Sequence, residues 1–384
     1  MKIAFLSEKY TPDIGGLAIS AERLVRLLTS AGHHVRVFAP TLNLPASETR
    51  TLLADRVGIT RFGVHKRVDD TLVDWFELIT AEHKRDPFEV IHAYFLTQAG
   101  FVAAYAGNYL GIPSVVSARG NDLDRGIFDP SRAGHILYTL QHANAVTTNA
   151  KELAKKAASL VPGLQVTVTP NGIDTEHFKP LLRNNALADS LSLMNVPVGE
   201  ASRVIGFAGE LREKKGLYPL LSAYAQINKK TPATLLLVGD IRAGEDRQVF
   251  EEFKLMHPEL QIVVTGFVSP NDLPAYYSLM DVFVQPSLRD GLPNALLEAM
   301  ACGKAVIGSS VGGMLDVIID CENGRLVSTN NVDELADTID ELLMDANQRM
   351  KLGKEACQTI REKFTLQAEV DGNLEVYRRL GLQV

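Results

Sequence analysis

Short apolar runs of strand-like composition alternate along this chain with amphipathic stretches of helix length. Near-continuous apolar strands joined by helices predict a parallel sheet that is covered on both faces. Ligands of such sheets bind beyond the carboxyl ends of the strands. In the first half of the chain the runs are Ile3 to Leu6, Val35 to Phe38, Val90 to Ile91, Val115 to Val116 and Ala145 to Thr147.

The same alternation restarts in the second half, which predicts a second sheet of the same kind. Its runs are Arg203 to Phe207, Thr234 to Val238, Gln261 to Val264, Asp281 to Val284 and Lys304 to Ile307. The chain has 384 residues, well above a typical domain of about 150, so we expect two domains. The stretch from Pro180 to Val198 has no strand pattern and is the predicted linker. After Asn331 the pattern is helical only.

Composition and charge narrow the classes of function. With 46% hydrophobic and 22% charged residues, the chain is globular rather than disordered, collagen-like or coiled-coil. The net charge of −7 excludes a surface that binds nucleic acid as a whole, so a bound phosphate must meet a local cluster of cations.

The cysteines and the apolar runs indicate in which cellular compartment the protein is expected. Cys302, Cys321 and Cys357 lack the spacing of a zinc site, and we expect reduced thiols in a cytoplasmic protein. The first apolar run is too short for a signal peptide, and no run approaches the roughly 18 residues of a membrane span. The sequence thus predicts a soluble protein, with contact to a membrane surface left open.

The most informative segment runs from Gln285 to Lys304 and is predicted to form strand, loop and helix. A glycine in the loop lets backbone approach a ligand, and a proline suits the first helical turn. The first backbone N–H groups of the helix would face an anion. We expect a phosphate or sugar cradle made of Gly291, Leu292, Pro293, Asn294 and Ala295.

Two carboxylates belong to the same segment. Glu298 lies in an apolar stretch, so its carboxylate needs a hydrogen-bonding partner, and a ribose diol would serve. Asp290, just before the helix, would accept hydrogen bonds from sugar hydroxyls in the same crevice. A helix cap plus a structural carboxylate is the competing interpretation.

A glycine-ended strand leads into a basic loop from Gly209 to Gly216. Arg212 and Lys215 in this loop would hold a diphosphate and favour the charge that a leaving diphosphate gains in the transition state. A solvated charge cluster is the alternative.

In the first domain, Gly15 and Gly16 follow the first strand and permit close approach to a ligand, although an ordinary turn explains them equally well. The sequence has no G-x-G-x-x-G fingerprint and no Walker A loop, which argues against a dehydrogenase and against an ATPase.

Weaker candidates lie at the ends of other strands of the first domain. His92 and Tyr94 are placed for acceptor contact, although a hydrogen-bonded core histidine is at least as good a reading. Arg119 is a candidate contact to a diphosphate or sugar. Asp122 is another acceptor-side candidate. With Asp124 it matches a three-residue metal pattern that arises often by chance, so we expect no metal.

Together these segments resemble the large glycosyltransferase family of GT-B fold, the "glycosyl transferases group 1", which includes sucrose-phosphate synthases and bacterial phosphatidylinositol mannosyltransferases. The resemblance spans nearly the whole chain. Its most specific part runs from Pro286 through Gly312-Gly313 to Asn323-Gly324, and the turn Asn171 to Asp174 and Thr265-Gly266-Phe267 add to it.

The resemblance implies an α/β protein with two Rossmann-like domains whose parallel sheets face a central cleft. Residues 1–180 would form the acceptor domain together with a final crossover helix in 365–384, and residues 181–364 would form the donor domain. Carried over by position, Glu298 would bind the ribose, Asp290 the sugar, Lys215 the diphosphate and Gly16 the β-phosphate. Gly15, Gly209 and Phe267 complete the expected donor contacts.

Three positions depart from the family pattern. Asp290 replaces a glutamate, Glu210 stands where an arginine is usual, and Arg119 stands where a histidine is frequent. We expect Arg212 to substitute for the missing arginine.

The resulting hypothesis is a hexosyl transfer from a nucleoside diphosphate sugar, UDP-linked, to the hydroxyl of a saccharide, lipid-linked or small-molecule acceptor. The resemblance implies retention of anomeric configuration without a metal or other cofactor. A catalytically weak nucleotide-sugar binding protein and a sugar-nucleotide epimerase are the alternatives, and a nicotinamide oxidoreductase is a more distant one.

Overall fold

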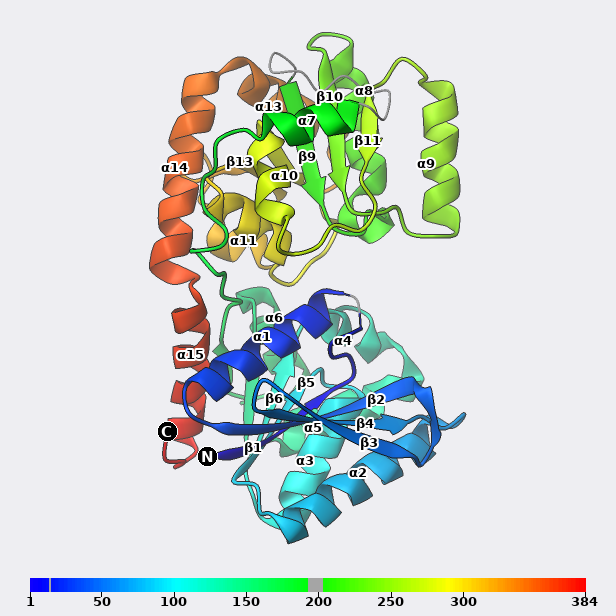
Figure 1. Cartoon of the computed structure of the whole chain (residues 1–384), viewed down its shortest axis with the longest axis vertical. Coiled ribbons are helices and arrows are strands. Elements are labelled where there is room, and N and C mark those ends of the chain that lie inside the picture. The colour runs from blue at the N-terminus through cyan, green and yellow to red at the C-terminus, as the bar shows by residue number, and fades with distance from the viewer. Residues whose placement is uncertain (14, 193–202) are drawn as a thin grey trace. The chain divides into compact units, whose positions relative to one another are not determined.

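The computed structural model describes residues 1–13, 15–192 and 203–384, which form two compact units (Figure 1). Unit 1 contains Met1–Gly172 and Leu366–Val384, and unit 2 contains Ile173–Thr365. Each unit is built on one sheet with helices on both faces, as the alternating apolar runs predict. The first division between the units falls at Gly172, ahead of the predicted position at 180.

The sheet of unit 1 has the strand order β3-β4-β2-β1-β5-β6-β7-β8 in the described residues. Its strands are β1 (Lys2–Ser7), β2 (His34–Ala46), β3 (Thr49–Ala54), β4 (Val57–Gly63), β5 (Val90–Tyr94), β6 (Ser114–Ala118), β7 (Ala145–Thr148) and β8 (Val166–Val168). All pairings are parallel except that of β3 with β4. The chain builds outward from β1 in one direction and then returns to β5, so the order reverses between β1 and β5.

Two layers of helices cover this sheet. The helices of unit 1 are α1 (Gly16–Ser30), α2 (Val68–Arg85), α3 (Gln98–Leu110), α4 (Asn121–Asp124), η1 (Gly126–Phe128), α5 (Pro130–His142), α6 (Lys151–Leu160) and α15 (Leu366–Arg379). Helices α1 and α15 share one apolar core with the sheet, and α2, α3, α5 and α6 share the other. The last helix of the chain therefore completes the core of the first unit, as the resemblance implies.

The sheet of unit 2 has the order β11-β10-β9-β12-β13-β14, and every pairing in it is parallel. Its strands are β9 (Arg203–Ala208), β10 (Ala233–Val238), β11 (Ile262–Val264), β12 (Val282–Gln285), β13 (Ala305–Ser309) and β14 (Arg325–Val327). Here the order reverses between β9 and β12, where β9 pairs with β12 through Ile205↔Val282 and Gly206↔Phe283.

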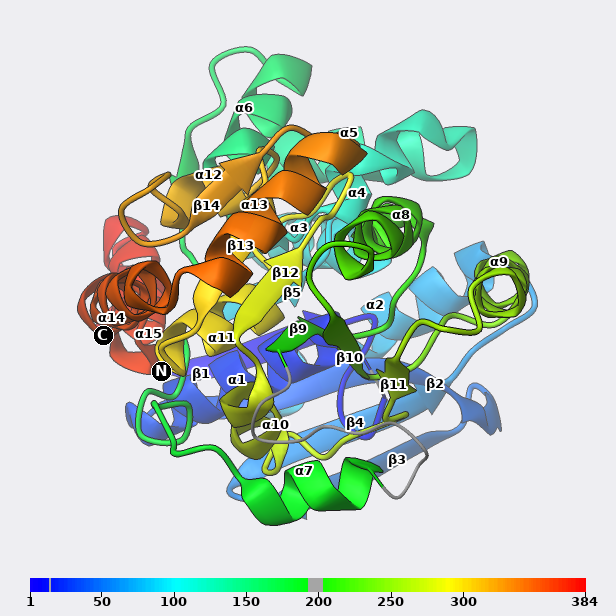
Figure 2. The ribbon, with the colours of Figure 1, turned by 90° about the horizontal axis from the view of Figure 1, so that it is seen from above.

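The helices of unit 2 also form two layers (Figure 2). They are α7 (Asn185–Ser192), η2 (Glu213–Lys215), α8 (Leu217–Asn228), α9 (Glu245–Met256), α10 (Leu273–Leu279), α11 (Asn294–Ala301), α12 (Met314–Val317), α13 (Val332–Met344) and α14 (Ala346–Lys363). Helices α8, α9 and α13 share one core, and α10, α11 and α12 share the other. Helix α7 lies inside the predicted linker, whose residues 193–198 lie outside the described residues.

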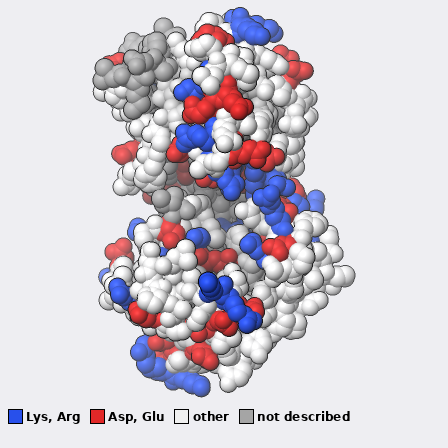
Figure 3. Space-filling model, turned by 90° about the vertical axis from the view of Figure 1, so that its right-hand side faces the viewer, with Lys and Arg blue, Asp and Glu red and all other residues white. Residues whose placement is uncertain are grey.

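The surface carries mixed charge. Lys and Arg side chains are interspersed with Asp and Glu on the face shown in Figure 3, in keeping with the modest net charge of −7. Every helix in the described residues is too short or too polar to span a bilayer.

A chain of buried hydrogen bonds ties α15 to the sheet of unit 1. The hydroxyl of Tyr377 lies 2.6 Å from Nδ1 of His92, and Nε2 of that ring lies 3.0 Å from the hydroxyl of Ser117. Ser117 in turn shares a 2.6 Å hydrogen bond with Thr147. Burial of His92, which has no exposed surface, lowers its pKa to about 3, and the charge of Arg119 adds to the effect. The imidazole is therefore neutral in the folded protein.

This buried imidazole predicts that unit 1 loses stability in acid. Because the pKa of His92 is about 3 when folded and about 6.5 when unfolded, only the unfolded chain gains this proton as the pH falls between those values. The free energy of unfolding should thus be about 2 kcal/mol lower at pH 5 than at pH 7 through this group alone. Urea unfolding of the wild type and of His92→Gln at both pH values measures it. Equal losses in the two proteins would contradict the assignment.

Candidate functional site

The reversal of strand order in unit 2 brings two predicted segments together. The basic loop follows β9, and the loop with Asp290 follows β12, which is the neighbour of β9 in the sheet. Ligands of open parallel sheets bind at the carboxyl edge where the strand order reverses. The two most informative segments of the sequence therefore meet at the place that the fold favours for a ligand.

These two loops contact each other through backbone. The N–H of Leu288 donates to the carbonyl oxygen of Lys214 at 3.0 Å. Gly216, with φ of +87°, is the N-cap of α8, and a Cβ at this position would lie 2.1 Å from the carbonyl oxygen of Pro286. No side chain fits there, so glycine is required for the close approach.

A third segment closes the other side of the Asp290 loop. The N–H of Gly313 donates to the carbonyl oxygen of Gly291 at 2.6 Å. Gly312 has a φ of +56°, and a Cβ on it would lie 1.7 Å from the carbonyl oxygen of Asp290. The backbone at Asp290 and Gly291 is thus held between the basic loop and the glycine pair that follows β13.

Within this frame, Lys215 forms an ion pair with Asp290. Both side chains are largely buried, with 23% and 13% of their surfaces exposed. The hydroxyl of Ser287 donates to the same carboxylate at 3.3 Å, and the side-chain amide of Gln285 donates to Ser287 at 2.9 Å. The side chains predicted to hold the diphosphate and the sugar are therefore in direct contact in the structure.

Arg212 lies in the same loop and contacts the residue that departs from the family pattern. Its guanidinium pairs with Glu210 at 3.4 Å. Its Nε is buried and has no hydrogen-bond partner in the described residues. Gly209, with φ of +119°, anchors the loop by donating its N–H to Val238 at 2.8 Å.

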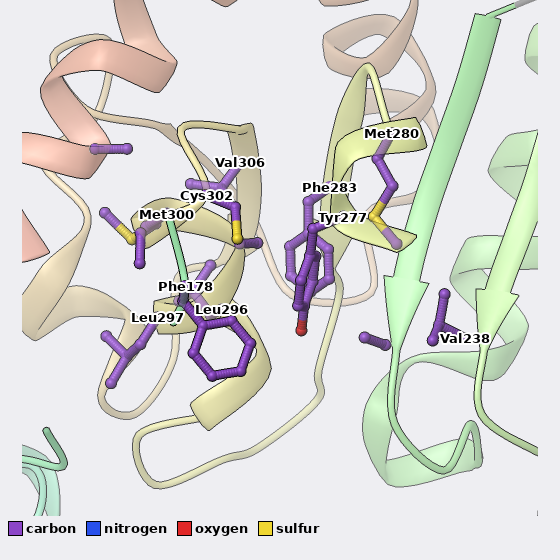
Figure 4. Close-up of a cluster of buried hydrophobic side chains, with 14 of the residues drawn as sticks. Phe178, Val238, Tyr277, Met280, Phe283, Leu296, Leu297, Met300, Cys302 and Val306 are labelled. Carbon is purple, nitrogen blue, oxygen red and sulfur yellow. The ribbon is translucent and has the colours of Figure 1, made fainter. Parts of the chain in front are cut away.

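Glu298 lies on α11, the helix that follows the Asp290 loop. Its carboxylate accepts a 2.7 Å hydrogen bond from the hydroxyl of Tyr277 on α10. The ring of Tyr277 is 1% exposed and packs 5.9 Å from that of Phe283 (Figure 4). Burial, together with the charge of Glu298, raises the pKa of this hydroxyl well above its usual value, so it remains a donor. The carboxylate thus has a protein partner that the sequence reasoning did not foresee.

The remaining donor candidates of unit 2 lie at the same carboxyl edge. Leu292 and Pro293 precede α11, which begins at Asn294 and continues through Ala295, with Pro293 as its N-cap rather than in its first turn. Phe267 follows β11, and its side chain is 74% exposed after Gly266, which has a φ of +69°. No group of three or more His, Cys, Asp or Glu side chains in the described residues is arranged to hold a metal ion.

In unit 1, the loop after β1 is held by an arginine that the sequence reasoning did not single out. Arg61 on β4 donates to the carbonyl oxygens of Tyr10 and Thr11 and pairs with Asp13 at 3.3 Å. Gly15, with φ of +132°, is the N-cap of α1, and a Cβ on Gly15 or Gly16 would meet no atom within 4 Å. The predicted glycine pair therefore lies in open space at the start of a helix, next to a loop that Arg61 fixes.

The acceptor-side candidates of unit 1 are mostly engaged within the protein. Both ring nitrogens of His92 are hydrogen-bonded and buried. The carboxylate of Asp122 is 1% exposed and accepts N–H groups of residues 119, 120 and 123, so it caps its own turn. Asp124, the other carboxylate of the metal pattern, pairs with Lys156 at 2.7 Å. These side chains act inside unit 1 rather than toward an acceptor, which corrects the expectation for His92 and Asp122.

The ring of Tyr94 is 1% exposed and lies under the guanidinium of Arg119, whose central carbon is 4.3 Å from the ring centroid. Arg119 also donates to the side-chain oxygen of Asn171 at 2.7 Å.

Two family models match this chain. Residues 14–177 match the model described as "Glycosyltransferase Family 4", and residues 195–359 match "Glycosyl transferases group 1". The two models together cover most of both units. The chain is a glycosyltransferase, and its residues 195–359 are of the group 1 type.

Relatives of this glycosyltransferase match it over nearly its full length. An uncharacterised glycosyltransferase of Methanocaldococcus jannaschii is 28% identical over 98% of each chain. A GDP-mannose-dependent alpha-mannosyltransferase of Mycolicibacterium smegmatis is 28% identical over 86% of this chain and 85% of its own. The solved sucrose-phosphate synthase of Thermosynechococcus elongatus is 23% identical and has a TM-score of 0.80, covering 99% of this chain and 98% of that one. This last likeness shows the GT-B fold.

The glycine geometry of this glycosyltransferase predicts a sharp effect at Gly312. Changing Gly312 to Ala would place a Cβ 1.7 Å from the Asp290 carbonyl oxygen at a φ of +56°, so the loops must separate. We expect a loss of about 2 kcal/mol or more of unfolding free energy. Thermal and urea unfolding of the whole chain measure it.

Gly134→Ala is the matched control, because a Cβ there meets no atom within 4 Å on helix α5. It should raise stability by up to about 1 kcal/mol. Equal stability of Gly312→Ala and the wild type would contradict the packing described for this loop.

Proposed function

We propose that this glycosyltransferase moves a hexosyl unit from a nucleoside diphosphate sugar to an acceptor hydroxyl, with retention of anomeric configuration. The observation that carries the proposal is the contact between Lys215 and Asp290 at the reversal of strand order in unit 2. A cation for the diphosphate and a carboxylate for the sugar hydroxyls lie side by side there, as transfer of a sugar from a diphosphate requires.

The proposed roles follow from the charges. Lys215 and Arg212 stabilise the diphosphate as it leaves, and Asp290 orients the sugar. Glu298, whose carboxylate Tyr277 holds at 2.7 Å, accepts hydrogen bonds from the ribose. Gly16 contacts the β-phosphate. Gly15, Gly209, Phe267 and residues 291–295 complete the donor contacts in this proposal.

In the proposed step, the bond from the anomeric carbon to the diphosphate oxygen breaks, and the acceptor oxygen bonds to the same carbon from the same face. The hydroxyl proton passes to the leaving phosphate oxygen. On this proposal the chain's own residues supply binding and charge stabilisation, and no metal or other cofactor is required.

The identity of the nucleotide is the open part of the proposal. From the sequence we expect a UDP-linked sugar, whereas the Mycolicibacterium smegmatis relative is described as GDP-mannose-dependent. The exposed ring of Phe267, 74% accessible at the end of β11, is our candidate contact for the base. We expect the reaction to occur in the cytoplasm, with a saccharide, lipid-linked or small-molecule acceptor and with membrane-surface contact left open.

The ribose role of Glu298 predicts which variant loses nucleotide binding. Thermal shifts with UDP, GDP, ADP and NAD should show stabilisation of the wild type by one diphosphate. A ligand at 100 times its dissociation constant contributes about 2.7 kcal/mol. Glu298→Ala should lose this shift, while the exposed Glu252→Ala on α9 should retain it. A shift only with NAD, or a full shift in Glu298→Ala, would refute the proposed donor site.

The role of Lys215 predicts a separate kinetic signature. Lys215→Ala should lower kcat by about 100-fold, the usual effect of removing one group that stabilises transition-state charge. It should change donor affinity much less. Lys214→Ala removes the same charge from the same loop and should leave kcat within a few-fold of wild type. Unchanged turnover of Lys215→Ala with the identified donor would rule out its catalytic role.

A further inference from the structure

The neighbouring strands β5, β6, β7 and β8 of unit 1 end at the same edge of the sheet. The residues that follow them include polar, charged and strained positions. Ala118 pairs with Thr148, so Arg119 and Asn149 follow β6 and β7 at the same level of the sheet. Tyr94 pairs with Ser117, so Phe95 follows β5 one position earlier, level with Ala118. Asn171 lies just beyond β8. The carboxyl edge of this half of the sheet therefore presents a cation and two amides side by side.

Arg119 differs from the other partly buried arginines of unit 1. Arg23 pairs with Glu369, Arg36 with Glu82, and Arg61 with Asp13. The guanidinium of Arg119 stacks on Tyr94 at 4.3 Å and donates to an amide oxygen at 2.7 Å. It forms no ion pair with any carboxylate in the part of the chain that the structure describes. A half-buried charge without a counter-ion is costly, so an anion from outside the protein fits beside it.

A second observation at the same edge is independent of Arg119. The side chain of Asn149 is 4% exposed, and its oxygen is buried without a hydrogen-bond partner in the described residues. Buried amide oxygens are nearly always paired. A ligand hydroxyl would supply the missing donor.

The backbone at this edge is also strained. Phe95 has a φ of +81° and is held there by donating its N–H to Ser117 at 3.0 Å. A bulky residue in this left-handed region is unusual, and such strain gathers at ligand sites.

We propose that this edge binds the acceptor, and that the acceptor is a polyhydroxy compound bearing a phosphate or carboxylate group. Arg119 holds the anion, and Asn149 accepts a hydrogen bond from a hydroxyl. The proposal rests on the proposed function, because it names the substrate that receives the sugar. It assigns Arg119 to the acceptor instead of to the donor diphosphate, which already has Lys215 and Arg212 in unit 2.

Calorimetric titration of the whole chain with four probes tests the site. Glucose 6-phosphate and glucuronate share a sugar skeleton but differ in the anion, glucose lacks the anion, and inorganic phosphate lacks the sugar. We expect one of the two anionic sugars to bind about tenfold or more tightly than glucose, since a charge-assisted hydrogen bond is lost without the anion. Which of the two binds identifies the anion.

Binding of the same probes to variants tells this site apart from other places where the probes could bind. Arg119→Gln should abolish the preference for the anionic sugar, and Asn149→Ala should weaken the sugar but not inorganic phosphate. Arg36→Gln is the matched control, because Arg36 also lies near an aromatic ring, 5.5 Å from that of Phe38, but has its own carboxylate. It should bind as wild type does. Lys215→Ala should also retain the anionic sugar, which excludes binding at the donor diphosphate site.

The proposal fails if glucose and both anionic sugars bind with the same affinity, or if Arg119→Gln binds the anionic sugar as wild type does. It also fails if none of the probes binds to a protein that binds a nucleoside diphosphate. Titration of the same samples with UDP and GDP keeps the two proposals apart. Binding of an anionic sugar that depends on Arg119, without nucleotide binding, would overturn the proposed function and leave the anion site in place.

Discussion

The pairing of β9 with β12 is the constraint on which the candidate site of unit 2 depends. Strands added later in the chain pass to the other side of β9, so the loops after β9 and β12 leave the sheet as neighbours. The backbone contacts at Gly216 and Gly312 then fix the Asp290 loop from two sides. A side chain in either place would push the loops apart, and the ion pair of Lys215 with Asp290 depends on their close approach.

This ion pair also sets the charge of the site when no ligand is bound. A cation and a carboxylate that are both largely buried cost free energy unless they are paired, and here each neutralises the other. On the proposed roles, a diphosphate that engages Lys215 competes with Asp290 for the cation and so frees the carboxylate for sugar hydroxyls. The proposal therefore couples the side chain that binds the leaving group to the side chain that binds the sugar.

Much of the fold was predictable from the sequence because buried parallel strands leave a strong apolar signal. The runs at Ile3 and Thr234 became β1 and β10, both buried along almost their whole length. By contrast, β3 was not foreseen, since all six of its residues are exposed and nothing in their order requires a strand. The short strands β8 and β14 have three residues each, too few to show a period.

The candidate site was predictable where a residue type has few other uses, as with the glycines and the acidic and basic residues near Asp290. It was not predictable where a contact joins distant segments. Tyr277 reaches Glu298 from another helix, and Arg61 fixes the Tyr10 loop from another strand. At His92 the sequence suggested a ligand contact, but the side chain is already hydrogen-bonded to the Tyr377 hydroxyl. A histidine at the end of a strand gives no sign of a partner so distant in the sequence.

The return of α15 to the first unit has a consequence for synthesis of the chain on the ribosome. Unit 1 begins with the first residue, but its core includes Val370, Leu374 and Tyr377, and a hydrogen bond from Tyr377 reaches its central sheet. Unit 2 ends at Thr365, so all of its residues emerge before α15 does. Domains usually complete folding in the order in which they are encoded. Here the unit whose synthesis begins first cannot complete its core until α15 has been synthesised, after all of unit 2.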